Sequence, residues 1–337
     1  MRVTVLLGGA SDERDVSLAT GAQVARALRA AGHEVTAFDT AQGPMTRDQE
    51  EALLGKGVDP RPASLALRDR LVEEGMSFLA EYPEAAAADV FFIALHGGDG
   101  EDGTLQKQLD RAGVVYTGSG PVACRAAMDK DLTKAVLQER GIPTPAWLTD
   151  CFDPDRVEAE LGLPVIVKAA NGGSSLRLEL AHDRSELEGA LERARDFQDS
   201  VVVERYVRGR EFTVGILDQE ALPVGEIIPR GEYFDYECKY QPGMAREVFP
   251  AELDPAKAGE MQALALEVHG ALGLRDYSRI DFMMDEKDGL WCLEANTLPG
   301  LTANSLVPKA AAAAGIAFPE LCHRLVDAAA RRGAVGT

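Results

Sequence analysis

The sequence has few of the features that mark secreted or membrane proteins. Its five cysteines show no CxxC spacing and are odd in number, which argues against a disulfide framework or a zinc ribbon. The N-terminus, MRVTVLLGGASDERDVSL, has an apolar run too short for a signal peptide. No stretch approaches the roughly 20 apolar residues that a membrane helix needs. We therefore expect a cytoplasmic protein with no membrane partner.

Basic residues are also in short supply. The chain has 35 Lys and Arg against 55 Asp and Glu, a formal net charge of −20. This balance disfavours nucleic acid as a partner. It still permits a phosphorylated ligand, which needs only a local cluster of positive groups. With 46% hydrophobic and 27% charged residues the composition is that of a globular protein, and 337 residues suffice for two or three lobes.

The N-terminal part has the pattern of an open parallel sheet. Its strands are predicted at Val3–Leu7, Glu34–Phe38 and Val90–Leu95, with a helix at residues 16–31. Glycine-rich turns follow the first and third strands, at Gly8-Gly9 and at residues 96–103. Because an open α/β sheet binds ligands beyond the carboxyl ends of its strands, both turns should line one crevice. Residues 42–63 are polar and interrupted by Gly and Pro, so we expect irregular structure there.

The pattern changes after Ser119, where two further lobes are expected. Helices are predicted near residues 128–140, 183–197, 255–272 and 318–331, and strands near 164–169, 200–206, 277–284 and 291–294. The expected lobes are residues 1–118, 119–203 and 204–337.

Two pairs of polar residues give the strongest chemical signal. Arg279-Ile-Asp281 and Glu294-Ala-Asn296 each lie on a predicted strand, where residues two apart share a face. Two carboxylates and an amide oxygen from paired strands form an oxygen-only site suited to Mg²⁺ bridging nucleotide phosphates. Arg279 would neutralise negative charge that develops beside it. Taken alone, the pattern fits a solvated face of two edge strands equally well.

The residues that follow predict a turn and a helix. Pro299-Gly300-Leu301-Thr302 is the turn, Asn304 is a suitable N-cap, and Pro308 fits near a helix start. Free backbone N–H groups of Ser305 and Leu306 are expected at the positive end of this helix, where they would bind a carboxylate. An ordinary capped helix without a ligand has the same sequence features.

The segment LEANTLPGLT-x-x-SLVPKAA resembles the metal and second-substrate segment of the D-alanine–D-alanine ligases, members of the ATP-grasp superfamily. Segments similar to the same family occur along nearly the whole chain, in the family's order: LLGGASDERDVSL, ALHGGDGEDGTLQ, YTGSG followed by MDKDLTK, LPVIVKAANGGSS and EIIPRGEYFDYECKY. The resemblance implies an α/β (α+β) ATP-grasp fold. In it an N-terminal open parallel-sheet lobe precedes two lobes that sandwich ATP.

The resemblance also implies a nucleotide site and a metal site. The implied ATP-binding residues are Lys130 and Lys168 at the phosphates, Gly172, Gly173, Ser174 and Ser175 in a closing loop, Glu204 at the adenine amino group, Arg205, Tyr206 and Val207 beside it, Glu211 at the ribose, and Lys239 on a second loop. The implied ligands of Mg²⁺ or Mn²⁺ are Asp281, Glu294 and Asn296.

Its implied catalytic residues are Glu13, Ser174, Tyr240, Arg279 and Gly300. Among these, Glu13 receives the ammonium of the first amino acid, and Arg279 and the Gly300 N–H stabilise the tetrahedral intermediate. Tyr240 lies on the closing loop with Lys239 and is hydrogen-bonded toward Ser174 and Glu13. The further substrate-binding residues implied are His96 near the first amino acid, and Ser305 and Leu306 at the carboxylate of the second.

The implied reaction joins two D-alanines through an acyl phosphate, with ADP and phosphate as by-products, for peptidoglycan synthesis by a homodimer. Alternatives are a ligase with another acceptor, such as D-lactate or D-serine, and an inactive nucleotide-binding relative. Tyr240 favours the dipeptide-forming branch, because the depsipeptide branch tends to carry histidine there. Three departures from the family pattern are Leu176-Arg177 in place of Val-Gly, Asn304 where histidine is frequent, and Ala169 where proline is common.

Overall fold

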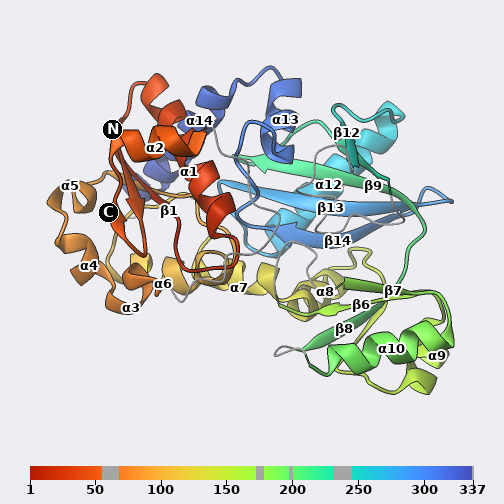
Figure 1. Cartoon of the computed structure of the whole chain (residues 1–337). Helices are drawn as coiled ribbons and strands as arrows, with labels where there is room; N and C mark the ends of the chain where they lie inside the picture. The colour runs from red at the N-terminus through yellow and green to blue at the C-terminus, as the bar shows by residue number, and fades with distance from the viewer. Residues whose placement is uncertain (55–67, 172–177, 197–199, 231–244, 336–337) are drawn as a thin grey trace.

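Three β-sheets form the framework of the computed structural model, which describes residues 1–54, 68–171, 178–196, 200–230 and 245–335 (Figure 1). Within these residues the N-terminal sheet has the strand order β3-β2-β1-β4 and the central sheet the order β5-β8-β6-β7. The C-terminal sheet has the order β12-β11-β9-β13-β14, with β10 paired to β9. The expected fold class, an N-terminal sheet lobe followed by two sheets that face each other, is confirmed.

The N-terminal sheet is parallel around its central strand. β1 (Arg2–Leu7) pairs in parallel with β2 (Glu34–Asp39) and β4 (Val90–Ile93), and the short β3 (Gly43–Pro44) adds an antiparallel edge. Helix α1 (Arg14–Ala30) makes the crossover from β1 to β2. A Cβ atom at Gly21 of this helix would collide with Leu7, so glycine lets α1 approach the sheet closely.

Further helices surround this sheet. They are α2 (Arg47–Leu54), α3 (Arg70–Glu74), α4 (Met76–Ala80), α5 (Pro83–Ala86), the 3₁₀ turn Gly98–Gly100 and α6 (Thr104–Arg111). The expectation of irregular structure over residues 42–63 is wrong for α2. Thr46 and Gln49 form a capping box at its start: Thr46 N donates to Gln49 Oε1 (2.8 Å), and Gln49 N donates to Thr46 Oγ1 (3.3 Å).

Two short helices connect the first lobe to the central sheet. The helix expected at residues 128–140 is present as α8 (Lys130–Glu139), and Asp129 separates it from α7 (Pro121–Met128), which was not expected. The Asp129 side chain accepts hydrogen bonds from the N–H groups of Asp131 and Leu132, as an N-cap should.

The central sheet is antiparallel and has helices on one face. Its strands are β5 (Trp147–Thr149), β6 (Val165–Ala169), β7 (Leu178–Ala181) and β8 (Val201–Arg205), and its helices are α9 (Pro154–Leu161) and α10 (Arg184–Ala194). Val165, Val167, Val201 and Val203 pack in the core under these helices. Because side chains alternate along a strand, Lys168 and Glu204 project from the opposite face. Since β8 includes Glu204 and Arg205, the central sheet runs two residues past the expected boundary at 203.

The C-terminal sheet repeats this design with longer strands. Its strands are β9 (Gly209–Leu217), β10 (Glu220–Ala221), β11 (Gly225–Pro229), β12 (Ala245–Val248), β13 (Tyr277–Asp285) and β14 (Leu290–Asn296), and helix α12 (Pro255–Ala271) lies on one face. The even-numbered Ile280, Phe282 and Met284 of β13 are buried in one core with Val268 of α12. The odd-numbered residues, Arg279 and Asp281 among them, therefore face the central sheet.

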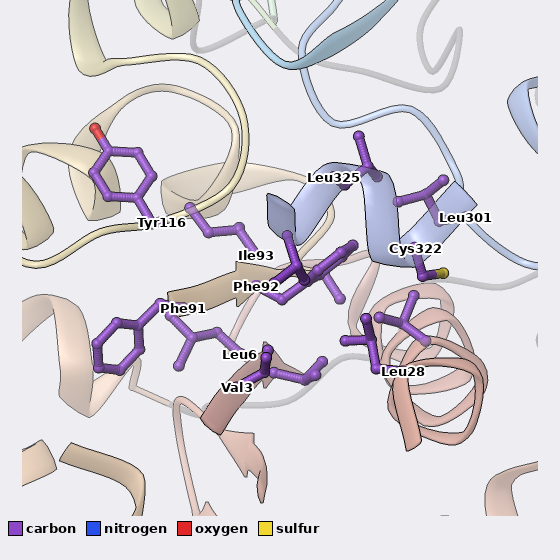
Figure 2. Close-up of a cluster of buried hydrophobic side chains, with 14 of the residues drawn as sticks. Val3, Leu6, Leu28, Phe91, Phe92, Ile93, Tyr116, Leu301, Cys322 and Leu325 are labelled. Atoms are coloured by element: carbon purple, nitrogen blue, oxygen red, sulfur yellow. The ribbon is translucent and has the colours of Figure 1, made fainter. Parts of the chain in front are cut away.

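The chain ends on the N-terminal lobe. After α13 (Leu306–Ala313), the last helix α14 (Phe318–Val335) packs against α1 and β4. Cys322 and Leu325 of α14 belong to the same buried cluster as Leu28 of α1 and Phe92 of β4 (Figure 2). The cysteines in the described part, Cys124, Cys151, Cys292 and Cys322, are buried free thiols. Among the described helices, none combines the length and apolar character needed to cross a membrane.

Candidate active site

A pocket opens between the central and C-terminal sheets, on the faces that their helices leave uncovered. It encloses roughly 780 Å³, part of it open to solvent, a size typical of small-molecule sites. The lining residues are Ile166, Lys168, Leu178, Glu204, Arg205, Tyr206, Val207, Glu211, Ile227, Arg279, Asp281, Met283, Leu293 and Glu294. Eight of them were expected at the nucleotide and metal sites, and Arg279 was expected as a catalytic residue. The lining residues come from seven strands and from the segment after β8.

Three charged side chains meet at the central sheet. Lys168 Nζ donates to Glu204 Oε1 at 2.6 Å, and Lys134 Nζ lies 2.9 Å from Glu204 Oε2. All three residues are buried. Burial by itself raises the pKa of a carboxyl group, but the two ammonium groups outweigh it and lower the pKa of Glu204 to about 2. Glu204 is therefore a permanent anion at neutral pH.

Asp281 is the centre of a second polar cluster, on the C-terminal sheet. Asp281 and Glu294 are paired across β13 and β14, and so are Arg279 and Asn296. Arg279 donates to both oxygens of the Asp281 carboxylate, from Nη2 to Oδ2 at 2.8 Å and from Nε to Oδ1 at 3.0 Å. Thr213 Oγ1 on β9 donates to Asp281 Oδ1 at 2.7 Å, and Asn296 Nδ2 donates to Oδ2 at 3.1 Å.

The chemistry of this cluster fits a hard divalent cation. Asp281, Glu294 and Asn296 offer only oxygen ligands from paired strand positions, the donor set that Mg²⁺ and Mn²⁺ prefer. In the described part of the chain, no three His, Cys, Asp or Glu side chains gather as a metal cage. Mg²⁺ usually keeps part of its shell for water and phosphate oxygens and needs only one or two carboxylates from the protein.

The turn before α13 brings Gly300 and Ser305 together. A Cβ atom at Gly300 would lie 2.9 Å from Ser305 Oγ, so only glycine leaves room for this hydroxyl. The N-cap of α13 is Ser305 and not Asn304, because Ser305 has extended backbone angles and the helix starts at Leu306. The Ser305 N–H was expected to be free, but it donates to Thr302 O at 2.9 Å. Leu306 remains at the first helical position, where the N–H has no intrahelical acceptor.

The two glycine-rich turns of the N-terminal sheet line a second hollow, as expected. Its lining residues are Gly8, Gly9, Ala10, Ser11, Asp69, Leu95, His96, Gly97, Gly98, Asp99 and Gly100. The imidazole of His96 is held by Thr20 Oγ1, 3.0 Å from Nε2, and by Glu101 Oε1, 3.7 Å from Nδ1. Glu13 begins α1 beside this hollow, and a Cβ atom at Gly97 would lie 2.8 Å from Glu13 Oε2. Burial raises the pKa of Glu101, and the charge of Glu13 adds to the effect.

Comparisons with known proteins agree on one family. Residues 2–119 match the family model of the D-ala D-ala ligase N-terminus, and residues 136–327 match that of the C-terminus. The chain belongs to the D-alanine–D-alanine ligase family. It is 40% identical to a D-alanine–D-alanine ligase of an Anaeromyxobacter species, over 98% of this chain and 97% of the relative. A Synechococcus ligase is 38% identical over 98% of this chain and 94% of its own length.

Solved structures support the same assignment. A D-alanine–D-alanine ligase from Bacillus anthracis, complexed with ATP, superposes with a TM-score of 0.78 at 28% identity, and the match covers 100% of both chains. The resemblance read from the sequence motifs is therefore confirmed, as is the ATP-grasp fold. Membership in this family makes the chain a ligase.

Several residues implied by the ligase resemblance lie outside the described residues. They are Gly172, Gly173, Ser174, Ser175, Lys239 and Tyr240, together with the departure at Leu176-Arg177. Lys130 lies at the start of α8, and its N–H donates to Ala170 O at 3.0 Å. This bond places the first turn of α8 beside the end of β6, directly before residues 172–177.

Two polar residues of this ligase site did not emerge from the sequence. Lys134 is one helical turn after Lys130 in MDKDLTK, a spacing that puts both on one side of α8 and could have indicated a shared role. Thr213 carries no comparable signal. It looks like an ordinary strand residue, and only the pairing of β9 with β13 sets it opposite Asp281.

Proposed function

We propose that this chain joins two molecules of D-alanine into D-alanyl-D-alanine at the expense of ATP, the reaction for which its family is named, and that the product serves peptidoglycan synthesis. The observation that carries the proposal is the pocket between the two sheets. On the central sheet it contains the buried Glu204 carboxylate, which is paired with Lys168. On the C-terminal sheet it contains the oxygen ligands around Asp281 together with the Arg279 guanidinium.

The proposed adenine site is the part of the pocket that Glu204 lines. Apolar side chains from both sheets, Ile166, Leu178 and Ile227 among them, provide walls for a flat ring. The Glu204 carboxylate accepts a hydrogen bond from the adenine amino group, with the backbone of Arg205, Tyr206 and Val207 beside it, while Glu211 binds the ribose hydroxyls. The charges of Lys168 and Lys130 serve the phosphates.

The proposed phosphoryl-transfer site is the cluster around Asp281. Asp281, Glu294 and Asn296 would hold Mg²⁺ or Mn²⁺, which neutralises charge on the nucleotide phosphates when bound. Arg279 adds a fixed positive charge from the same strand face, and this charge stabilises the oxyanion that develops during the reaction. The pairing of β13 with β14 positions all four side chains before any ligand enters.

The proposed reaction has two steps. A carboxylate oxygen of the first D-alanine attacks the γ-phosphorus of ATP and gives D-alanyl phosphate and ADP. The amine of the second D-alanine then attacks the acyl carbon and loses a proton, and phosphate leaves. We assign the ammonium of the first D-alanine to Glu13, with His96 nearby, and the second carboxylate to the Ser305 hydroxyl and the Leu306 N–H at the positive end of α13.

The remaining roles are also proposals. Gly300 N–H would donate to the tetrahedral intermediate, and Ser174, Tyr240 and the closing loops would exclude water from the acyl phosphate. We further propose a cytoplasmic homodimer of three-lobed subunits, with lobe boundaries after residue 118 and after the end of β8 at Arg205. Light scattering of the purified chain tests the dimer directly.

A substrate panel tests the proposed function. Phosphate release with ATP and Mg²⁺ is expected with D-alanine alone, and mass spectrometry should identify the dipeptide. D-lactate or D-serine added beside D-alanine should give little mixed product. Turnover without D-alanine, or none with it, would contradict the proposal.

A further inference from the structure

The Lys134 ammonium lies behind the pocket and not in it. Its side chain is fully buried, at 0% exposure, and it is not among the residues that line the pocket. Three oxygen atoms surround Nζ: Glu204 Oε2 and Thr144 Oγ1, each at 2.9 Å, and Pro145 O at 3.1 Å. Thr144 Oγ1 and Pro145 O accept hydrogen bonds from Nζ, and Glu204 Oε2 makes an ion pair with it, so the position suits a charged lysine.

The Glu204 carboxylate is held from two sides. Lys168 donates to Oε1, while Oε2 is buried and accepts no hydrogen bond from the described residues, so its contact with Lys134 is an ion pair without hydrogen-bond geometry. Oε2 therefore has lone pairs that no hydrogen-bond donor among the described residues uses. Glu204 lines the pocket, so a ligand there can reach its carboxylate group.

Lys134 and Lys168 differ in whether a bound nucleotide can contact them. Lys168 lines the pocket, where phosphate oxygens would compete with Glu204 for its charge, whereas Lys134 is fully buried and does not line the pocket. Lys134 is therefore the counter-charge that stays with Glu204 when the pocket is filled. Burial lowers the pKa of Lys134, and the Glu204 carboxylate opposes this change.

We infer that Lys134 is a positioning residue that sets base specificity, by keeping Glu204 an anion turned toward the base. This inference rests on the proposed adenine site. A 6-aminopurine offers N–H donors to the carboxylate, whereas a 6-oxopurine presents an oxygen, which the anion repels. Discrimination between the two bases then depends on Lys134, although Lys134 touches neither.

The experiment compares ATP with ITP, which differ at the 6-position and in the protonation of the adjacent ring nitrogen. Steady-state kinetics with saturating D-alanine would be measured for the parent and for Lys134→Met, which keeps the length of the side chain and removes its charge. We expect the KM for ATP to rise about tenfold, because about one charge-assisted hydrogen bond to the base is lost. The preference for ATP over ITP should fall by a similar factor. The kcat with ATP and the KM for D-alanine should change less than about threefold, since neither depends on the base.

Leu137→Ala is the matched control on the same helix. Leu137 is fully buried in α8 and belongs to the hydrophobic core of the C-terminal sheet, so its truncation should cost about 2–5 kcal/mol of stability without changing the ATP-to-ITP preference. Lys134→Met with an unchanged preference, in a protein whose melting is cooperative, would overturn the inference and leave Lys134 as a structural residue.

A double-mutant cycle keeps the test decisive if Lys134→Met does not fold. Glu204→Gln should itself lower the ATP preference, and adding Lys134→Met to it removes both members of the Lys134–Glu204 ion pair, which is less destabilising than removing one of them. If Lys134 acts through Glu204, the double variant should match Glu204→Gln. A further loss of preference in the double variant would overturn the inference.

The inference and the proposed function fail in different ways. An unchanged preference in Glu204→Gln would remove the adenine site and the inference with it, while ligation continued. A parent protein that releases no phosphate with ATP and D-alanine would overturn the proposed function instead.

Discussion

Arg279 and Asp281 are joined by a two-point contact along one strand face. Nη2 and Nε of the guanidinium donate to the two carboxylate oxygens at 2.8 and 3.0 Å, and both side chains are largely shielded from water. Such a contact fixes the plane of the carboxylate as well as its position. The arginine thus both holds a proposed metal ligand and places a positive charge where phosphoryl oxygens would lie.

Arg279→Met should lower kcat by about 10²–10³, because a preorganised charge that stabilises an oxyanion has this effect. Arg279→Lys should restore little of it, since one ammonium cannot make both contacts. Steady-state phosphate release measures both variants. Arg210→Met is the control: Arg210 makes a similar two-point contact with Glu226 in the same sheet but outside the pocket. Equal losses at Arg210 and Arg279 would mean that the effect is structural.

Glu294→Gln should nearly abolish turnover and leave the fold intact. The substitution keeps the size of the side chain but removes one of two carboxylates proposed to bind Mg²⁺. The exposed Glu286, in the turn between β13 and β14, gives the matched variant Glu286→Gln, which should retain full activity. Activity would be followed across a Mg²⁺ titration. Ordinary rates for Glu294→Gln at ordinary Mg²⁺ would refute the metal assignment.

Thr213→Val should weaken the apparent Mg²⁺ affinity. The Thr213 hydroxyl donates to Asp281 Oδ1 at 2.7 Å, and valine has the same shape without the donor. Loss of a hydrogen bond that orients a metal ligand typically costs about 10- to 100-fold in metal affinity or activity. High Mg²⁺ should therefore recover most of the activity of this variant, unlike that of Glu294→Gln. A change in kcat that no Mg²⁺ concentration reverses would assign Thr213 a different role.

The sequence predicted the parts of the site that follow from local periodicity. Arg279 and Asp281 were expected on one strand face because side chains alternate along a strand, and the structure places them so. Lys168 directly follows the apolar residues PVIV, where a solvated charge would be unusual, and the structure buries it. Segment order and motif length identified the family, which no single pattern could do.

Contacts between distant segments were not predictable in this way. Lys134 and Glu204 are joined only because α8 packs beside the central sheet, and Thr213 reaches Asp281 only through the pairing of β9 with β13. Boundaries failed for local reasons: the capping box at Thr46 begins a helix where irregular structure was expected, and Ser305 replaces Asn304 as the N-cap. The roles of residues 172–175, 239 and 240 stay predictions.

Lys168→Ala should raise the KM for ATP far more than the KM for D-alanine. Lys168 lines the pocket and is proposed to serve the nucleotide phosphates, and it also holds Glu204 Oε1 at 2.6 Å. Its loss affects two nucleotide contacts and no proposed D-alanine contact. Lys107→Ala, at an exposed lysine of α6, should behave as the parent. If both KM values rise together after Lys168→Ala, the residue is structural and the phosphates lie elsewhere.

The stability of the protein should fall as the pH drops from neutral toward 4, and His269 should account for part of this. His269 is buried in α12, with Nδ1 2.7 Å from Ser278 Oγ and Nε2 without a partner among the described residues. Burial lowers the pKa of His269 from 6.5 to about 4. Between these pH values the unfolded state binds a proton at His269 and the folded state does not. This contribution to the free energy of unfolding is therefore fully present above pH 6.5 and is lost as the pH falls toward 4.

The size and source of this loss can both be measured. At 1.36 kcal/mol per pKa unit, the shift corresponds to at most about 3 kcal/mol. Urea unfolding of the parent and of His269→Gln would be compared from pH 7.5 to 4.5. The variant should be less stable at pH 7.5, because its amide fits the site less well, yet its stability should fall less on acidification.

The exposed His182 provides the control, His182→Gln, whose pH dependence should match that of the parent. Burial of His33 lowers the pKa of that residue as well, but it contributes equally to all three proteins and cancels in the comparison. Parallel curves for the parent and His269→Gln would show that the folded protein accommodates the protonated imidazole, and the acid sensitivity would then belong to other groups.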